Sequence, residues 1–246
     1  MHEVLIAIVT VFCLLSAAIG GLLCSAKLRS RHLQDDTNAT VRLVANIFVV
    51  MTTLVLSLMM NSARNTLELN ERNVHALATD LILLDRLMRS LGPQAEQAHQ
   101  HLVEYVQTSL TDSNIAEKDP QAESFLGAVG ESLREIRPSN DQQTALWNDA
   151  RQLYQQAVQQ RWVVVDASSG TIPAPLIILV IAWLVMIFAS FGYRAPRNAV
   201  VIAAFVVAAL LMSATLFLIL DMDAPKTGLI QVSNQPFQRA LAELQR

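Results

Sequence analysis

Residues 43–60 read LVANIFVVMTTLVLSLMM, and none of these eighteen residues is charged. A helix needs about 20 mostly apolar residues to cross the hydrocarbon core of a bilayer. Three more runs of similar length contain no charged residue, and they are Val4–Leu23, Pro175–Phe191 and Ala199–Leu220. Four such runs rarely share one soluble fold. The sequence therefore predicts an all-α, polytopic membrane protein with four transmembrane helices in two pairs.

The composition agrees with this prediction and excludes several other classes. Of the 246 residues, 52% are hydrophobic and only 16% are charged, against roughly 25% charged residues in a soluble domain. The formal net charge of -3 argues against a nucleic-acid partner, which usually meets a strongly basic patch. The two cysteines, Cys13 and Cys24, lie in or beside the first apolar run, which excludes a disulfide framework and a four-cysteine zinc site.

Basic residues are concentrated in the two short loops that join the members of each pair. Lys27, Arg29 and Arg31 follow the first run, and Arg194 and Arg197 follow the third. Loops rich in Lys and Arg usually stay in the cytoplasm. We therefore expect the termini and the long middle segment to lie outside the cytoplasm. If the host is bacterial, the protein is expected in the inner membrane, with these parts in the periplasm. The first run lacks a basic segment before it, so it is expected to be a retained span rather than a cleaved signal peptide.

The middle segment is predicted to be a helical bundle. No Gly or Pro occurs between Val41 and Leu91, so the second span should continue as one helix up to Gly92-Pro93. Its outer part repeats apolar residues in steps of three and four, a heptad pattern that packs against the same chain or a neighbouring one. This seam comprises Leu67, Asn70, Val74, Leu77, Leu81, Leu84, Met88 and Leu91. Further helices are expected at residues 93–110, 120–136 and 139–165.

The predicted organisation is therefore a first transmembrane pair at residues 1–60, a helical bundle at 61–171, a second pair at 172–220 and a tail at 221–246. The chain contains no hydrolase elbow, phosphate loop or zinc-protease motif, so we expect neither an enzyme nor a cofactor. His99 and His101 are two residues apart and should point to different faces of a helix, which disfavours a metal site. Asp85 and Arg89 have the spacing of an ion pair on a solvated helix face.

The second span carries a polar face. The steps between its polar residues are four, seven, four, four and three, which places them near one side of a helix. These residues are Arg42, Asn46, Thr53, Ser57, Asn61 and Arg64. They either bond to neighbouring helices or line a water-filled pore. An arginine stands at each end and no carboxylate lies between, so a pore on this face would favour anions.

Small residues in two other spans predict close helix contacts. The pairs are Ser16–Gly20 and Ala17–Gly21 in the first span, and Ala204–Ala208 and Ala209–Ser213 in the fourth. Spacing of four between small residues lets helix backbones approach each other in a membrane. The pattern does not distinguish contacts within the chain from contacts between subunits.

The tail combines an acidic turn with a short helix. Asp221, Asp223, Pro225 and Gly228 follow the fourth span, and Pro236 then opens an amphipathic helix that includes Phe237. Two carboxylates are too few to indicate a cation site. A capping or turn-forming role is therefore favoured for the acidic pair.

Two of these stretches resemble the bestrophin-like domain family of membrane proteins. They are Leu43–Leu102, which ends in LDRLMRSLGPQAEQAHQHL, and the closing stretch FLILDMDAPKTGLIQVSNQPFQRAL at residues 217–241. The family's closing motif has an acidic residue, an Asp-x-Pro step, a Gly and a Pro-Phe helix. The residues that match it are Asp221, Asp223, Pro225, Gly228, Pro236 and Phe237. An aromatic residue often follows the first proline in that family, whereas this chain has Lys226.

The resemblance implies kinship with bestrophins, which are pentameric anion channels whose second span lines the pore. It implies a homo-oligomer in lipid that passes anions, in agreement with the polar face described above. Bestrophins keep their termini and helical domain in the cytosol, whereas the basic loops here predict the opposite side. Their aromatic pore constriction has no clear match, because Phe48 is the only aromatic residue in the second span. The alternative is a non-conducting scaffold or sensor whose outer helical domain binds a partner.

Overall fold

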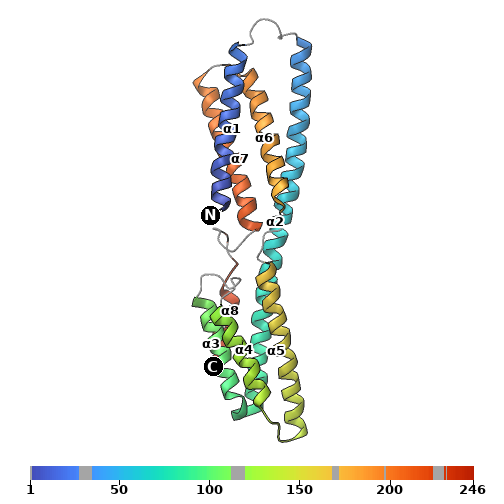
Figure 1. The fold of residues 1–246 in the computed structure, drawn as a ribbon, viewed down its shortest axis with the longest axis vertical. Helices are drawn as coiled ribbons and strands as arrows, with labels where there is room; N and C mark the ends of the chain where they lie inside the picture. Colours follow the sequence, from blue (N-terminus) through green and yellow to red (C-terminus); the bar gives the residue numbers. More distant parts are fainter. Residues whose placement is uncertain are drawn as a thin grey trace. The chain divides into compact units, whose positions relative to one another are not determined.

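The computed structural model describes residues 2–27, 35–111, 120–167, 172–196, 198–223, 230 and 232–246 (Figure 1). The long elements are α1 (His2–Lys27), α2 (Asp35–Leu91), α5 (Asp141–Ala167), α6 (Ala174–Arg194) and α7 (Ala199–Asp223). The shorter ones are the 3-10 helix η1 (Gly92–Ala95), α3 (Glu96–Thr111), α4 (Pro120–Glu135) and α8 (Gln235–Leu244). These described ranges contain no strand, which confirms the all-α prediction.

Four stretches are long and apolar enough to cross a membrane. Three of them are Glu3–Cys24, Ala174–Arg194 and Ala199–Asp223, and the other runs from Arg42 to Leu110 and includes the charge-free run of α2. The prediction of four spans is therefore confirmed. The described chain divides into two compact units. Met1–Asn65 with Thr171–Leu229 is called the membrane unit below, and Thr66–Gly170 with Ile230–Arg246 is called the helical domain.

The core of the membrane unit is built from α1, α6 and α7, with one side of α2 packed against it. Fully or almost fully buried side chains include Leu14, Met59, Val180, Leu184 and Leu216. The hydroxyl of Ser213 on α7 donates a hydrogen bond to the carbonyl oxygen of Ala7 on α1 at 2.6 Å. A hydroxyl that bonds across helices in this way stabilises helix association where water is absent.

Two glycines let α1 and α6 approach closely. A β-carbon on Gly192 would collide with the carbonyl oxygen of Ala18, and one on Gly21 would collide with the carbonyl oxygen of Ala189. Gly20, the neighbour of Gly21, has no atom of the described chain near the position of a β-carbon. Of the glycines in the predicted small-residue pairs, Gly21 is therefore the one that makes the contact within the chain.

The helical domain buries the heptad seam of α2 in its own core. Val74, Leu77, Leu81, Leu84 and Met88 are all at most 1% exposed, and they pack with residues of α3, α4, α5 and α8. These seam residues therefore pack against helices of the same chain. α2 ends at Leu91, as predicted, because Gly92 adopts a φ of 79° and Pro93 has no N–H for a further helical hydrogen bond.

Candidate functional site on the polar face of α2

The spanning part of α2 turns one narrow side toward its own chain. Ala45, Thr52, Met59 and Ala63 are buried, at 0–4% exposure, and they recur in steps of seven and four. Met59 and Ala63 belong to the core formed with α1, α6 and α7. This side of α2 is therefore occupied by contacts within the membrane unit.

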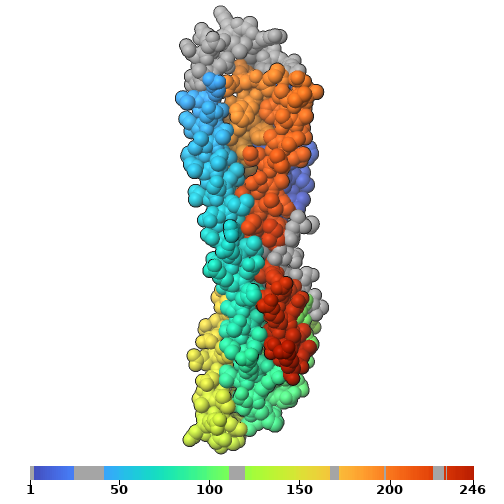
Figure 2. Space-filling model, turned by 180° about the vertical axis from the view of Figure 1, so that it is seen from behind, coloured from blue at the N-terminus to red at the C-terminus, as the bar shows by residue number. Residues whose placement is uncertain are grey.

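The predicted polar face points elsewhere. All six of its side chains are exposed, and they are Arg42, Asn46, Thr53, Ser57, Asn61 and Arg64. At 100° per residue they lie on a different side of α2 from the buried positions. The contrast is sharpest at two neighbouring threonines, because Thr52 is buried and Thr53 is exposed. The chain's own core therefore leaves the polar face uncovered, and Figure 2 shows an open side of α2 in the membrane unit.

The hydroxyls on this face are bonded to the helix itself. Thr53 donates to the carbonyl oxygen of Val49 at 2.8 Å, and Ser57 donates to that of Thr53 at 2.8 Å. Their oxygens still offer free lone pairs, and the amide of Asn46 has two donor hydrogens and an acceptor. A helix backbone cannot satisfy all of these groups, and an unsatisfied polar group is costly in lipid. The amide of Asn46 in particular is therefore suited to contact with water or with another polar group.

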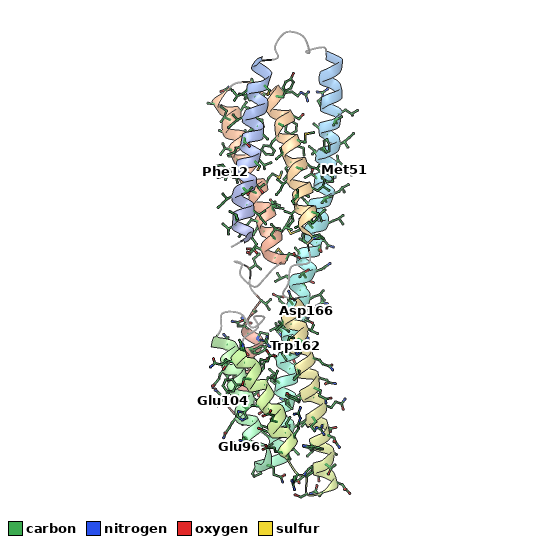
Figure 3. All side chains as sticks on the ribbon, viewed as in Figure 1. Phe12, Met51, Glu96, Glu104, Trp162 and Asp166 are labelled. Carbon is green, nitrogen blue, oxygen red and sulfur yellow. The ribbon has the colours of Figure 1, made fainter. Side chains whose placement is uncertain are left out.

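Apolar side chains cover the rest of the exposed surface of α2. Leu43, Ile47, Leu54 and Leu58 are between 55% and 69% exposed. Figure 3 shows Met51 pointing away from the other helices of the membrane unit, as does Phe12 on α1. Lipid or further copies of the chain must cover this surface, because an apolar patch of this size is not stable in water.

The acidic pair of the tail motif lies at the end of α7. Asp221 and Asp223 are 1% and 4% exposed. Oδ2 of Asp223 accepts a hydrogen bond from the backbone N–H of Ile172 at 2.9 Å, just before α6 begins. The carboxylate thus joins the end of α7 to the residue before the N-cap of α6, although no side chain caps α6 itself. No group of three metal-ligating side chains occurs in the described part of the chain.

The other tail-motif residues are divided between two places. Pro225 and Gly228 lie outside the described residues. Pro236 and Phe237 are buried at the start of α8, where Phe237 joins the core of the helical domain. The described residues of the motif therefore lie at two places, the end of α7 and the start of α8.

The comparison with known families decides the identity of the fold. Residues 12–237 match the bestrophin-like domain. The chain belongs to the bestrophin-like domain family. This match confirms the resemblance that residues 43–102 and 217–241 indicated. No curated protein matches the chain.

Solved structures with the same fold include bacterial bestrophin homologues. One point variant of a homologue from Klebsiella pneumoniae is 12% identical, with a TM-score of 0.58 over 100% of this chain and 98% of that one. A second variant is 12% identical, with a TM-score of 0.59 over 99% and 98%. A structure described as a membrane protein is 11% identical, with a TM-score of 0.62 over 96% of both chains. At these identities the likeness concerns the fold alone.

In this bestrophin-like chain, the Asp85–Arg89 pair differs from its prediction in one respect. The ion pair forms, with 2.9 Å between Oδ2 of Asp85 and Nε of Arg89, but the Asp85 side chain is only 3% exposed. The expected solvated face is wrong for Asp85, because His99 of α3 covers it with Nδ1 at 2.7 Å from Oδ1. His101 instead lies 3.3 Å from Glu104 on its own helix. The spacing of residues along α2 carries no signal for a partner on another helix.

A second buried polar group lies between α3 and α5 of the bestrophin-like chain. Tyr105 is fully buried, with Ser109 and Arg161 near its hydroxyl. Burial raises the pKa of the Tyr105 hydroxyl, and the positive charge of Arg161 and the hydroxyl of Ser109 oppose that rise. Arg161 is 9% exposed and faces the core, whereas the neighbouring Trp162 is 49% exposed.

Proposed function

We propose that this protein is a homo-oligomeric anion channel in which α2 lines the conducting path. The observation that carries the proposal is the exposure of all six polar side chains of α2 on a side that the chain's own core leaves uncovered. A single chain cannot enclose a path with one helix. Several copies related by a closed rotation, each turning this face inward, form a wet lumen and keep the apolar surface toward lipid.

The charges on the face favour anions over cations. Arg42 and Arg64 stand at its two ends, and no acidic residue occurs between them on α2. Rings of positive charge at a constriction attract anions and repel cations. Asn46 adds amide hydrogens that can replace part of the hydration shell of an anion. Membership of the bestrophin-like family and the fold shared with bacterial bestrophin homologues support the same function.

The alternative is a non-conducting scaffold or sensor, and the geometry supports it less well. The heptad seam of α2 favours this alternative only if it is available as a surface for a partner. That seam is buried in the core of the helical domain, so it is occupied within the chain. The six polar side chains of α2 stay exposed in the membrane unit, which favours the channel.

Chloride flux into liposomes tests the proposal. The reconstituted protein should conduct, and Asn46→Leu should lower the flux by about tenfold, which corresponds to about 1.4 kcal/mol in the barrier, because it removes the amide from a narrow lumen. Ile47→Leu is the matched control, since Ile47 is exposed on the apolar side of the same helix. Absence of chloride flux, or equal flux through Asn46→Leu and Ile47→Leu, would rule the proposal out.

We further propose that the helical domain and both termini lie on the extracytoplasmic side of a bacterial inner membrane. Lys27, Arg29, Arg31, Arg194 and Arg197 in the short loops support this orientation. Ser139→Cys, in a chain whose Cys13 and Cys24 are replaced by alanine, should react with an impermeant maleimide added outside intact cells. Reaction only after the cells are opened would place the helical domain in the cytoplasm and reject this orientation.

A further inference from the structure

The C-terminal helix α8 is attached to the helical domain through one charged side chain of α2. Nη2 of Arg89 donates hydrogen bonds to the carbonyl oxygen of Leu244 at 2.7 Å and to that of Glu243 at 3.1 Å. The last carbonyls of a helix lack regular partners within it, and a positive charge there also complements the helix dipole. Figure 2 shows α8 (red) at the surface beside α2 and α3.

Arg89 is itself held in place by a buried carboxylate. Its Nε lies 2.9 Å from Oδ2 of Asp85, whose side chain is 3% exposed. The other oxygen of Asp85 lies 2.7 Å from Nδ1 of His99 on α3. A buried carboxylate is stable only when it is paired, so Asp85 holds Arg89 in place. Asp85, Arg89 and His99 thus connect α3, α2 and the end of α8 in one series of polar contacts.

The remaining contacts of α8 are apolar. The helix has 10 residues, of which Pro236, Phe237, Ala240 and Leu244 are buried, and Leu241 packs against the same core. A helix of this length is not stable in water without tertiary contacts. Its attachment therefore depends on these apolar contacts and on the Arg89 hydrogen bonds together.

The Arg89 contact lies beside an open cleft. The cleft has a volume of about 960 Å³ and is lined by Arg89, His99, Leu244 and Arg246, with Glu96 and Glu104 of α3 along its wall (Figure 3). The Arg89 side chain is 42% exposed, so water and ions reach the guanidinium. Water can therefore compete with the carbonyl oxygens of α8 for the guanidinium of Arg89.

We propose that Asp85, Arg89 and His99 form a latch, and that α8 is a strap which detaches while the rest of the helical domain stays folded. Local opening of a short terminal element needs much less free energy than global unfolding. Release uncovers the apolar side of α8, including Phe237 and Ala240, and widens the cleft.

Hydrogen exchange of the full-length protein in detergent tests the latch. In Arg89→Gln the backbone amides of residues 238–244 should exchange about tenfold faster or more, because a charge-assisted hydrogen bond to the helix end is lost. The amides of α3 and α5 should change by less than about threefold if the strap opens by itself. Arg86→Gln is the matched control, since Arg86 is exposed on the same helix and should leave α8 unchanged.

Two results would overturn the latch. One is equal exchange of α8 in Arg89→Gln and Arg86→Gln, and the other is a parallel increase in α3, α5 and α8, which would mean that α8 opens only with the whole domain. If Arg89→Gln does not fold, Arg89→Lys and Asp85→Asn provide the same comparison. Lysine keeps the charge but lacks the planar guanidinium that contacts Asp85 and the carbonyls of α8 with different nitrogens. Asparagine removes the negative charge that orients Arg89. Each should accelerate exchange of α8 severalfold, and no acceleration in either would refute the latch.

Discussion

Replacing Arg42 with glutamate should lower the ratio of chloride to potassium permeability by about tenfold or more. The substitution changes the charge at one end of the polar face by two units in every copy of the chain. Two unit charges about 10 Å apart interact by about 0.4 kcal/mol even at the dielectric constant of water, and the contributions of several copies add. Since about 1.4 kcal/mol corresponds to a factor of ten, a ring of such changes is sufficient. Reversal potentials in a salt gradient measure the ratio.

The control for this substitution lies in the same unit. Arg194 is exposed at the end of α6 and is not part of the polar face of α2, so Arg194→Glu should leave the permeability ratio within about twofold of the wild type. Arg64→Glu should act in the same direction as Arg42→Glu, because Arg64 stands at the other end of the face. An unchanged ratio in both Arg42→Glu and Arg64→Glu would mean that α2 does not line the path.

The spans and the polar face could be predicted because they depend on local patterns. The charge-free run at residues 43–60 is long enough to specify a membrane helix by itself, and the six polar residues share a side by helix geometry alone. The sequence alone does not show whether that side of α2 faces the chain's own core or the outside of the chain. Thr52 and Thr53 are the same residue type one position apart, yet one is buried and the other is exposed. The difference arises from the docking of α1, α6 and α7 on α2, which is a tertiary property.

In the helical domain, too, local sequence patterns predicted the elements of the latch but not the contacts between helices. The spacing of Asp85 and Arg89 predicted their ion pair, and the apolar period of residues 236–244 predicted α8. Neither pattern predicts that His99 covers Asp85 or that Arg89 reaches the end of α8, because 154 residues separate Arg89 from Glu243. The closing motif of the family gave a signal for this region through Pro236 and Phe237, although it did not identify their contacts.

The close approach of α1 and α6 can be tested at two adjacent glycines of α1, with Gly21 as the test position and Gly20 as the control. A β-carbon on Gly21 would collide with backbone atoms of Ala189 and Tyr193, whereas none of the described atoms lies near that position on Gly20. Backbone atoms cannot move aside as a flexible side chain does, so the two helices would have to separate. Packing across a membrane interface of this kind depends on small residues that let the backbones meet.

Gly21→Ala should therefore lower the free energy of unfolding of the membrane unit by about 1–3 kcal/mol, the usual cost of overpacking a close contact. Gly20→Ala should instead be neutral or stabilising by up to about 1 kcal/mol, because alanine favours the helix where space is open. Both residues lie on α1 at nearly the same depth, so lipid, detergent and helix propensity affect the two variants alike. Thermal unfolding in a single detergent, monitored by circular dichroism, compares them. Equal midpoints for Gly20→Ala and Gly21→Ala would mean that α1 and α6 do not meet at Gly21, and the packing of the membrane unit would have to be different.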